Sequence, residues 1–462
     1  MSEEKFVFTG KAKQKLLTIL GVGVVLLIIG IIGLSNDWAV FDPAAHEANT
    51  HHSEIYSAPD LTANAGHHEE SVAIEGHGEE SHAHASHVEG HGYNWIKRVY
   101  ADLWHNNIFF MGIAIACVFF LALNYVTWAG WSAILKRVFE AFGYYIPIAG
   151  VLTLVIFSIA NHDLFHWTHD YLYDVNDARY DAIIAGKQNW LNMGFYYARM
   201  ITYFVLWSVL FFAIRNESQL EDLNGGTKHH NRMIVFSGIF IVVFGVTTST
   251  AAWDFIMSID THWFSTLFGW YVFASWFVSG IASIVLVTVL LKENGYLKQV
   301  NAEHLHDLGK FMFAFSIFWT YLWFSQFLLI WYANIPEESV YFIERLFNNM
   351  GVYLPVFVLN LIVCFAFPFL FFMTRDSKRA MTWLKVGSVA ILIGHWFDFY
   401  LMIMPGVLNE HGGFNLGNLF VELGIFMIFL SVFASAIMFG LSKANLIAKN
   451  HPMLDESINH HT

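Results

Sequence analysis

His395 and Asp398 form an ionisable pair in the middle of an apolar stretch, Leu384–Met404, that has the length of a transmembrane helix. At about 1.5 Å of rise per residue, His395 is expected near the centre of any bilayer that this stretch crosses. The i, i+3 spacing places both side chains on one face of a helix. Ionisable groups at that depth cost about 2.5–3.5 kcal/mol each, so they usually face a protein interior or a wet cavity. The pair is therefore a candidate for passing a proton, and a purely structural interhelical hydrogen bond is the alternative.

The composition of the chain is that of a membrane protein with many spans. Of its 462 residues, 56% are apolar, 18% are aromatic and only 13% are charged, and the mean hydropathy is +0.48. These values exclude an ordinary soluble domain. The formal net charge of −13 arises outside the apolar stretches, and no basic patch with interleaved aromatic residues is present, which excludes a nucleic-acid partner.

Ten apolar stretches are long enough to cross a hydrocarbon core about 30 Å thick, which predicts an all-α integral membrane protein with ten transmembrane helices. The stretches are Leu16–Leu34, Asn107–Tyr125, Ala141–Ala160, Asn192–Ile214, Met233–Phe255, Phe264–Leu291, Gly309–Tyr332, Met350–Met373, Leu384–Met404 and Asn418–Leu441. The chain is divided accordingly into a basic N-terminal segment with the first span (1–34), an external loop (35–104), two groups of four spans (105–255 and 256–405), and the last span with a C-terminal tail (406–462).

Alternating loops differ sharply in their content of lysine and arginine. If the N-terminus is cytoplasmic, the inner segments hold 18 of these residues and the outer loops hold five, while Arg199 lies within a span, which accounts for all 24. This asymmetry follows the positive-inside rule. We therefore expect both termini on the cytoplasmic side of the membrane.

The external loop, residues 35–104, is rich in histidine, glutamate, alanine and glycine, with ten histidines between His46 and His91. Such a composition cannot bury a core and is typical of a disordered loop. Metal binding by the histidines is the alternative, although their spacing is irregular.

Four further polar residues in the spans are candidates for a proton path or for the support of a quinol site together with His395 and Asp398. They are Arg199, Asp254, Gln326 and Glu422. Three of them have a simpler interpretation as well: Arg199, near a helix end, is of the kind that reaches toward lipid headgroups, and the carboxylates of Asp254 and Glu422 lie where a membrane interface is expected.

The chain lacks the usual sequence patterns for redox cofactors. Cys117 and Cys364 lie in separate apolar stretches, and no CxxC or CxxCH motif is present, so neither an iron–sulfur cluster nor a c-type haem is expected in this chain. A transmembrane b-type haem normally needs facing histidines on two spans, and His395 is the single histidine that the hydropathy pattern places deep in a span. Electrons are therefore not expected to pass through the chain.

Two long motifs carry a family resemblance. The stretch Trp253–Tyr271 reads WDFIMSIDTHWFSTLFGWY, and the stretch Phe313–Glu338 contains FAFSIFW, YLWFSQ and IWYANIPEE. In these motifs, and across most of its length apart from the histidine-rich loop, the chain resembles the F subunit (ActF) of bacterial alternative complex III. That complex is a quinol:cytochrome c oxidoreductase, and the subunit belongs with membrane proteins of the NrfD/polysulfide-reductase type.

The resemblance implies two four-helix bundles, made of spans 2–5 and 6–9, with the first and last spans at the periphery. It implies partner subunits that carry c-type haems and iron–sulfur clusters: a multihaem cytochrome c, an iron–sulfur subunit and a paralogous NrfD-like subunit. In that paralogue, the C subunit, a quinol pocket lies beside the iron–sulfur subunit, and a Pro-Pro pair follows its Trp-Asp-Phe element. This chain has no Pro-Pro after Phe268, which favours the F subunit and argues against a catalytic quinol site here.

We therefore expect an integral subunit of a respiratory quinol:cytochrome c oxidoreductase in the bacterial inner membrane, contributing proton conduction or support of the quinol site. Quinol oxidation releases two protons along with two electrons, and ionisable groups in a low-dielectric interior suit the handling of those protons. No metal and no covalently bound cofactor is expected. The sequence does not decide whether the chain contacts menaquinone or ubiquinone, or whether it carries out a catalytic step. The alternatives are a stand-alone proton-coupled transporter and a purely structural scaffold subunit.

Overall fold

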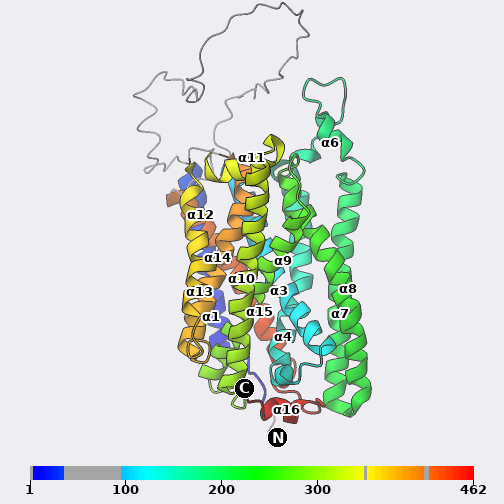
Figure 1. Ribbon diagram of the computed structural model, residues 1–462, viewed down its shortest axis with the longest axis vertical. Helices are drawn as coiled ribbons and strands as arrows, with labels where there is room; N and C mark the ends of the chain where they lie inside the picture. Colours follow the sequence, from blue (N-terminus) through cyan, green and yellow to red (C-terminus); the bar gives the residue numbers. More distant parts are fainter. Residues whose placement is uncertain (1–3, 36–94, 348–350, 410–415, 462) are drawn as a thin grey trace, which may run out of the picture.

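The computed structural model describes residues 4–35, 95–347, 351–409 and 416–461, and within these ranges it has no β-strand beyond an isolated bridge between Lys5 and Asn445. Ten helical segments are long and apolar enough to cross a membrane (Figure 1). They are α1 (Gly10–Ser35), α3 (Trp95–Val126), α4 with α5 (Lys136–Phe142 and Ile146–Leu164), α7 (Met193–Asn224), α8 (Thr227–Phe255), α9 (Leu267–Glu293), α10 (Ala302–Ala333), α12 to α13 (Leu354–Leu361 and Phe367–Phe371, joined by the π-helical turn η7, Ile362–Ala366), α14 (Met381–Leu408) and α15 (Leu416–Ser442). The prediction of an all-α membrane protein with ten spans is confirmed.

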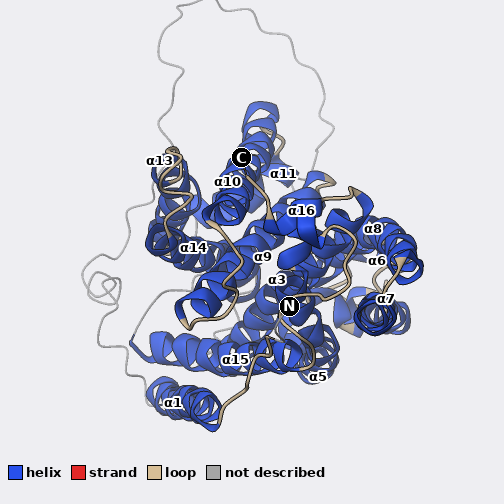
Figure 2. Ribbon diagram, turned by 90° about the horizontal axis from the view of Figure 1, so that it is seen from below, coloured by secondary structure: helices blue, strands red, loops and turns tan. Residues whose placement is uncertain are grey.

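Two four-helix bundles form the body of the described structure. In the first bundle, α3 packs against α5 and α8, and α7 closes the ring between them. In the second bundle, α9 packs against α10 and α14, and the segmented span α12–α13 closes the ring. The bundles meet along a seam in which α3 contacts α9 and α14, and α8 contacts α9; Figure 2 shows this arrangement from one end. The predicted grouping of spans 2–5 and 6–9 is therefore confirmed.

The first and last spans form a peripheral pair. α1 and α15 lie side by side at the edge of the molecule (Figure 2). Their backbones approach so closely that a Cβ added at Gly424 would lie 2.6 Å from Leu27 N and 2.8 Å from Gly23 O. Small residues permit such close packing between helices in lipid. α15 also contacts α3 and α4, which anchors the pair to the first bundle.

The second span begins earlier than the hydropathy pattern predicts. α3 starts at Trp95, so the last ten residues of the predicted loop 35–104 are helical. Arg98, assigned to an outer loop from the sequence, is fully buried in α3. Polar side chains at the start of the helix lower its local hydropathy, which is why an apolar window begins only at Asn107. Most of the predicted histidine-rich loop, residues 36–94, lies outside the described residues.

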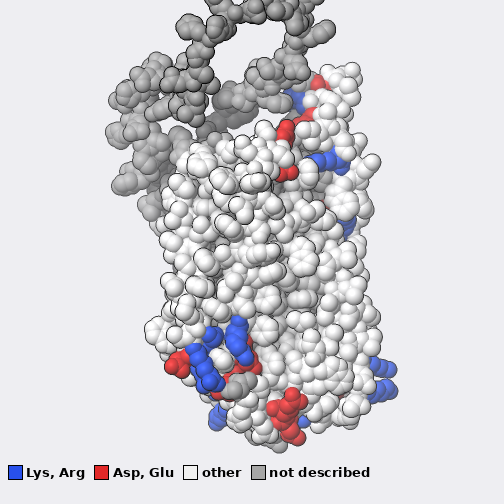
Figure 3. Space-filling view, in the orientation of Figure 1, with Lys and Arg blue, Asp and Glu red and all other residues white. Residues whose placement is uncertain are grey.

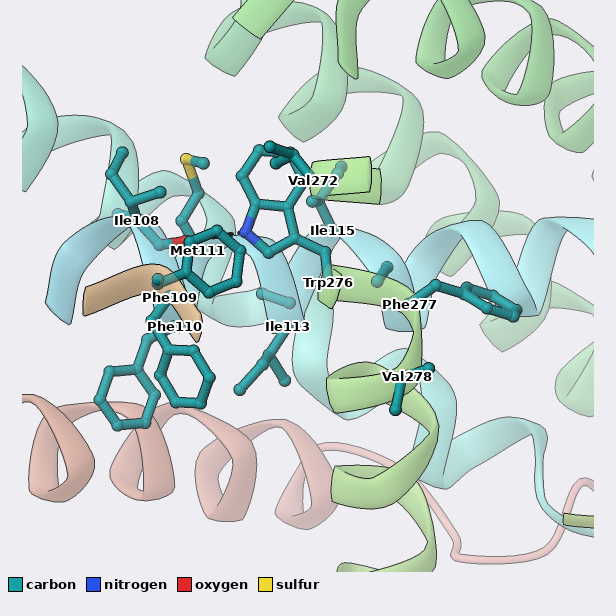
Figure 4. Close-up of a cluster of buried hydrophobic side chains, with 14 of the residues drawn as sticks. Ile108, Phe109, Phe110, Met111, Ile113, Ile115, Val272, Trp276, Phe277 and Val278 are labelled. Atoms are coloured by element: carbon teal, nitrogen blue, oxygen red, sulfur yellow. Dashed lines mark hydrogen bonds between the residues drawn. The ribbon is translucent and has the colours of Figure 1, made fainter. Parts of the chain in front are cut away.

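The seam between the bundles is filled by large apolar side chains from α3 and α9 (Figure 4). Trp276 on α9 is 1% exposed and donates a hydrogen bond of 3.2 Å from Nε1 to the backbone oxygen of Ile108. Its indole stacks on Phe399 of α14, with 5.9 Å between the ring centroids. Because burial of an aromatic side chain is worth a few kcal/mol, this tryptophan holds three spans together.

Charged side chains gather at the two ends of the molecule. Glu4 Oε1 accepts a hydrogen bond of 2.8 Å from Leu297 N, and Lys5 pairs with Asn445, so both terminal segments lie at one end of the bundles, hereafter the terminal end. On the face drawn in Figure 3, basic and acidic side chains gather near that end, side chains of both signs also lie near the opposite end, and a broad uncharged band lies between them. The opposite end carries the short helices α6 (Ala182–Gly186) and α11 (Pro336–Leu346), whereas α16 (Leu454–Ile458) lies at the terminal end. An uncharged band of this kind is what a lipid-facing surface requires.

Candidate functional site

Asp398 lies at the centre of a hydrogen-bond network inside the second bundle. Its carboxylate accepts four hydrogen bonds from three other spans: Oδ1 accepts from Tyr271 Oη and from Asn360 Nδ2 (3.2 Å), and Oδ2 accepts from Ser275 Oγ (2.6 Å) and from Trp319 Nε1 (2.9 Å). Asp398 itself is fully buried. Four donors replace the hydration that a buried carboxylate loses, so the site is built to hold a negative charge at this position.

His395 lies one helical turn from Asp398 but is held less tightly. Its Nδ1 is 3.5 Å from Asp398 Oδ2, and neither ring nitrogen makes a hydrogen bond within the described part of the chain. The ring is fully buried and stands edge-on to Trp319, with 5.3 Å between the centroids. A buried polar group without a partner is rare and often marks a functional site. The imidazole thus lies next to a well-held carboxylate, and neither of its nitrogens is occupied by a partner among the described residues.

The backbone next to His395 is shaped by a π-helical turn on the neighbouring span. At η7 the span α12–α13 approaches α14 so closely that a Cβ at Gly394 would lie 2.7 Å from Cys364 Sγ. Cys364 Sγ in turn donates to Asn360 Oδ1 over 3.0 Å, which turns the amide nitrogen of Asn360 toward Asp398. π-Helical turns inside longer helices frequently occur at functional sites.

A small cavity extends the network toward the end opposite the termini. It has a volume of about 20 Å³, and Tyr271, Gln326, Asn360 and Arg345 are among its lining residues. That volume admits roughly one water molecule. Gln326 Nε2 is buried and has no hydrogen-bond partner among the described residues, so it could bind such a water. Beyond the cavity, Arg345 donates to Asp260 Oδ2 over 2.8 Å.

A row of serine hydroxyls on α9 leads from Asp398 toward the terminal end. Ser275, which bonds Asp398, is followed at helical spacing by Ser279 and Ser283, and all three side chains are buried. Ser279 Oγ donates to the backbone oxygen of Ser275 over 2.7 Å. The i, i+4, i+8 spacing of these serines is visible in the sequence, but serine is also common at packed interfaces between spans, so the pattern alone does not predict a role.

Arg199 and Asp254, two of the candidates from the sequence, form an ion pair in the first bundle. Arg199 Nε lies 2.8 Å from Asp254 Oδ2, and Arg199 Nη2 lies 2.9 Å from Oδ1. Tyr203 Oη and Trp190 Nε1 also donate to this carboxylate, over 2.8 Å and 3.0 Å. The alternative interpretation of Arg199, a side chain reaching for lipid headgroups, is therefore wrong, because a carboxylate inside the protein binds the guanidinium at two points.

Glu422 pairs with a residue that the sequence had placed in a loop. Its carboxylate binds the guanidinium of Arg98, and both side chains are buried. Arg98 also donates to Tyr400 Oη over 3.2 Å. Among the described residues, no hydrogen bond or ion pair joins Glu422, Arg199 or Asp254 to His395 or Asp398. Of the four additional candidates, Gln326 alone lies beside the central network, in the cavity lined by Tyr271 and Asn360.

His395 is not the single buried histidine of the spans, which corrects the prediction; His105 is another, well inside its helix. It lies in α3, is fully buried and bonds the backbone oxygen of Trp396 through Nε2 at 2.9 Å. The number of buried histidines therefore does not by itself exclude a b-type haem. His105 is instead packed among side chains, with its ring 4.7 Å from the ring of Trp396 and 5.9 Å from that of Tyr400.

A further cluster at the terminal end contains residue types that bind metal ions. Ligand atoms of Glu221, His230 and His451 lie within 4.8 Å of one another, and all three residues are buried. Lys136 Nζ, however, lies 2.5 Å from Glu221 Oε2, and His451 Nδ1 accepts a hydrogen bond from Met453 N over 3.2 Å. A cation would compete with both interactions, so the contacts fit a salt-bridged link between the tail and the bundle better than a metal centre.

Comparison with known proteins gives no independent guide to the family. No protein-family model matches the chain, and no curated protein matches it.

Proposed function

We propose that this chain is a membrane subunit of a respiratory quinol:cytochrome c oxidoreductase of the alternative complex III type, in which it conducts protons. The observation that carries the proposal is the buried Asp398 carboxylate, held by four donors from three other spans beside His395, whose ring nitrogens have no hydrogen bond within the described residues. Ionisable side chains within a membrane are costly and are retained mostly for transport or proton transfer. The motif resemblance supplies the reaction to which those protons belong.

In this proposal, His395 and Asp398 form the proton-transfer pair at the centre of the pathway. Hydrogen bonds fix the carboxylate, while the imidazole 3.5 Å away is free to accept a proton and pass it on. The hydroxyls of Ser275, Ser279 and Ser283 offer a route toward the terminal end, and the cavity at Gln326 offers a water-sized step toward the opposite end. Serine hydroxyls both donate and accept, which proton transfer along a chain requires.

The electrons would travel through partner subunits. The two cysteines, Cys117 on α3 and Cys364 on η7, are buried in different bundles and unpaired, so they do not offer a cluster site. In the proposal, a multihaem cytochrome c and an iron–sulfur subunit carry the redox centres, and a paralogous NrfD-like subunit binds quinol from the menaquinone or ubiquinone pool. The complex lies in the bacterial inner membrane, and the lysine- and arginine-rich terminal end of this chain faces the cytoplasm.

A double variant tests the proposal. The complex carrying His395→Ala with Asp398→Asn should assemble but lose about 10²-fold in quinol:cytochrome c turnover, since positioned acid–base groups commonly contribute that much. Proton release measured in liposomes should fall with it. The matched control is His460→Ala with Asp307→Asn, a second His–Asp pair, 2.7 Å apart, at the terminal end, which should leave both quantities unchanged.

Two outcomes would count against the proposal. Full turnover with unchanged proton release in the His395/Asp398 variant would remove the proton-conducting role and leave a scaffold. Purification of the wild-type chain without any haem-containing partner, judged by optical spectrum and gel, would instead favour a stand-alone transporter.

A further inference from the structure

A cavity lies at the end opposite the termini, where α7 and α9 begin and α8 ends. Its volume is about 270 Å³, against about 20 Å³ for the cavity beside Gln326. Its lining includes Trp190, just before α7, Trp253, in the last turn of α8, and Phe264, just before α9. None of its described lining residues takes part in the proposed proton path.

Hydrogen bonds to Asp254 hold two sides of this cavity in place. Trp190 Nε1 donates to Asp254 Oδ1 over 3.0 Å. Ser258 Oγ, on the short helix η5 (Met257–Ile259), donates to the backbone oxygen of Asp254 over 2.5 Å. Arg199 Nη1 also donates to the backbone oxygen of Trp190 over 2.9 Å. The walls are therefore fixed before any ligand arrives, as in most sites for small molecules.

The walls are mainly apolar and aromatic, and they continue onto the surface. Trp190 is 40% exposed and Phe264 is 65% exposed, while Trp253, Met257 and Trp263 complete the apolar lining. Tryptophan is enriched at the level of the lipid headgroups in membrane proteins. A cavity at the ends of three spans with such a rim adjoins that layer of the bilayer, so we expect its occupant to be a molecule of the same layer.

Lys187 contributes a positive charge to the lining. Its ammonium donates to the backbone oxygen of Thr261 and lies 5.8 Å from the ring centroid of Phe264, but it forms no ion pair within the described ranges. Burial lowers the pKa of Lys187, and the charge of Asp181 opposes this effect. Asp181 is itself bound to His262 Nε2, over 2.6 Å. The cavity therefore has a partly buried cation that lacks a close counter-charge.

The charges of the lining select the kind of ligand. Aromatic walls by themselves would also suit a quaternary ammonium group, but Lys187 would repel it, and no aspartate or glutamate is among the described lining residues. A small inorganic anion would meet one cation and mostly apolar surface, which does not replace its hydration. A phosphodiester attached to acyl chains suits both features, because its phosphate can bind the ammonium while its chains cover the apolar walls.

We propose that this cavity is a binding site for an anionic phospholipid from the leaflet at the end opposite the termini. The phosphate binds Lys187, and the acyl chains lie against Trp253, Met257 and Phe264. Basic pockets between transmembrane helices bind acidic lipid headgroups by the same combination of charge and apolar surface. The site does not depend on the proposed conduction of protons.

Native mass spectrometry of the full chain tests this site, because it counts the lipids that stay bound after detergent is removed. Phosphatidylglycerol should bind the wild-type protein about fivefold more tightly than phosphatidylcholine, since one lysine near the headgroups contributes that much. Lys187→Gln should remove this preference. Inorganic phosphate in excess should not displace the lipid from the wild-type protein.

The matched control is Arg179→Gln, which removes a positive charge from the same connection between α5 and α7. Arg179 pairs with Asp177 at 3.1 Å and is not among the residues that line the cavity, so this variant should keep the wild-type preference. Gly186→Leu leaves the charge in place and changes the space. Gly186 lines the cavity, and a Cβ added there meets no atom within 4 Å, so the larger side chain should weaken the binding of phosphatidylglycerol without unfolding the protein.

Three results would overturn the proposal: equal affinity of the wild-type protein for the two lipids, an unchanged preference in Lys187→Gln, or displacement of the lipid by inorganic phosphate. The last result would assign the site to a free anion. If Lys187→Gln does not fold, Gly186→Leu decides, and unchanged binding of phosphatidylglycerol in that variant would place the lipid elsewhere.

Discussion

Arg199 and Asp254 meet in a two-point ion pair across α7 and α8, with nitrogen–oxygen distances of 2.8 Å and 2.9 Å. The guanidinium also lies 4.2 Å from the ring of Trp190, measured to the centroid. Planar, bidentate recognition of this kind is specific to arginine, because a lysine ammonium offers one point of charge.

Loss of this arginine should therefore destabilise the first bundle. Arg199→Ala leaves Asp254 buried and without its charge partner, which typically costs about 3–5 kcal/mol, and Arg199→Lys should recover only part of that. The double variant Arg199→Met with Asp254→Leu should be more stable than Arg199→Ala, since no charge is left uncompensated. Unfolding in mixed detergent measures all three, and a cost below about 1 kcal/mol for Arg199→Ala would contradict the importance of the pair.

Gly112 marks the tightest approach in the seam between the bundles. A Cβ at this position would lie 1.7 Å from Cδ1 of Trp276, so Gly112→Ala must displace an indole that is packed among three spans. Overpacking of this kind costs about 1–3 kcal/mol, and we expect the upper end because the tryptophan has no space to move into. Thermal unfolding of the purified chain gives the measurement.

The control for Gly112 is Gly238→Ala in α8, where an added Cβ would meet nothing within 4 Å. Alanine loses less backbone entropy than glycine when the chain folds, so this variant should be as stable as wild type or more stable by up to about 1 kcal/mol. Equal effects of the two substitutions would show that the close contact in the seam does not limit stability.

Glu344 in α11 should make stability depend on pH around neutrality. Burial, together with the nearby Asp260, raises the pKa of this carboxyl from 4.5 to about 7, against the opposing charge of Arg345. Between these two values the folded protein binds the proton more strongly than the unfolded chain, so stability falls as pH rises from about 4.5 through 7.

Replacement of Glu344 removes this dependence. Glu344→Gln should be more stable than wild type at pH 8, by less than about 3 kcal/mol because the side chain is partly exposed, and indistinguishable from it below pH 4.5. Thermal unfolding across that range gives the comparison, with Glu337→Gln in the first turn of the same helix as the control. A constant difference at every pH would refute the assignment.

His451 should make the docking of the C-terminal tail sensitive to acid. Burial, and next the charge of Lys136, lower the pKa of its imidazole from 6.5 to about 3. An undocked tail would bind the proton at pH values where the docked tail does not, so docking should weaken by about 1.4 kcal/mol for each pH unit below 6.5.

Hydrogen exchange of the tail, corrected for the intrinsic effect of pH, follows this docking. Protection of residues 446–458 should fall between pH 6.5 and 5 in wild-type protein. It should stay constant over that range in His451→Gln, whereas His461→Gln, which replaces an exposed histidine, should behave as wild type. Acid-independent protection in the wild-type protein would show that His451 is not the sensitive group.

The sequence by itself determined the number of spans, their order and the pair at the heart of the candidate site. Apolar length and period are properties of one segment at a time, so each span could be predicted without knowledge of its neighbours. The same is true of His395 and Asp398, because the rotation of an α-helix places residues three apart on one face. Grouping into two bundles came from the motif resemblance and agrees with the helix contacts.

Only the tertiary structure decided which polar groups meet. The donors to Asp398 come from residues 38 to 127 positions away in the chain, and no periodicity specifies how one helix is turned toward another. For the same reason, Arg199 and Asp254 could not be paired from the sequence. The start of α3 was missed because hydropathy counts Arg98 and Asp102 as a cost, whereas the fold pairs Arg98 with Glu422 inside the protein. A hydropathy window scores the polar residues of one segment. It cannot include the partner on another helix that makes such residues stable inside a membrane.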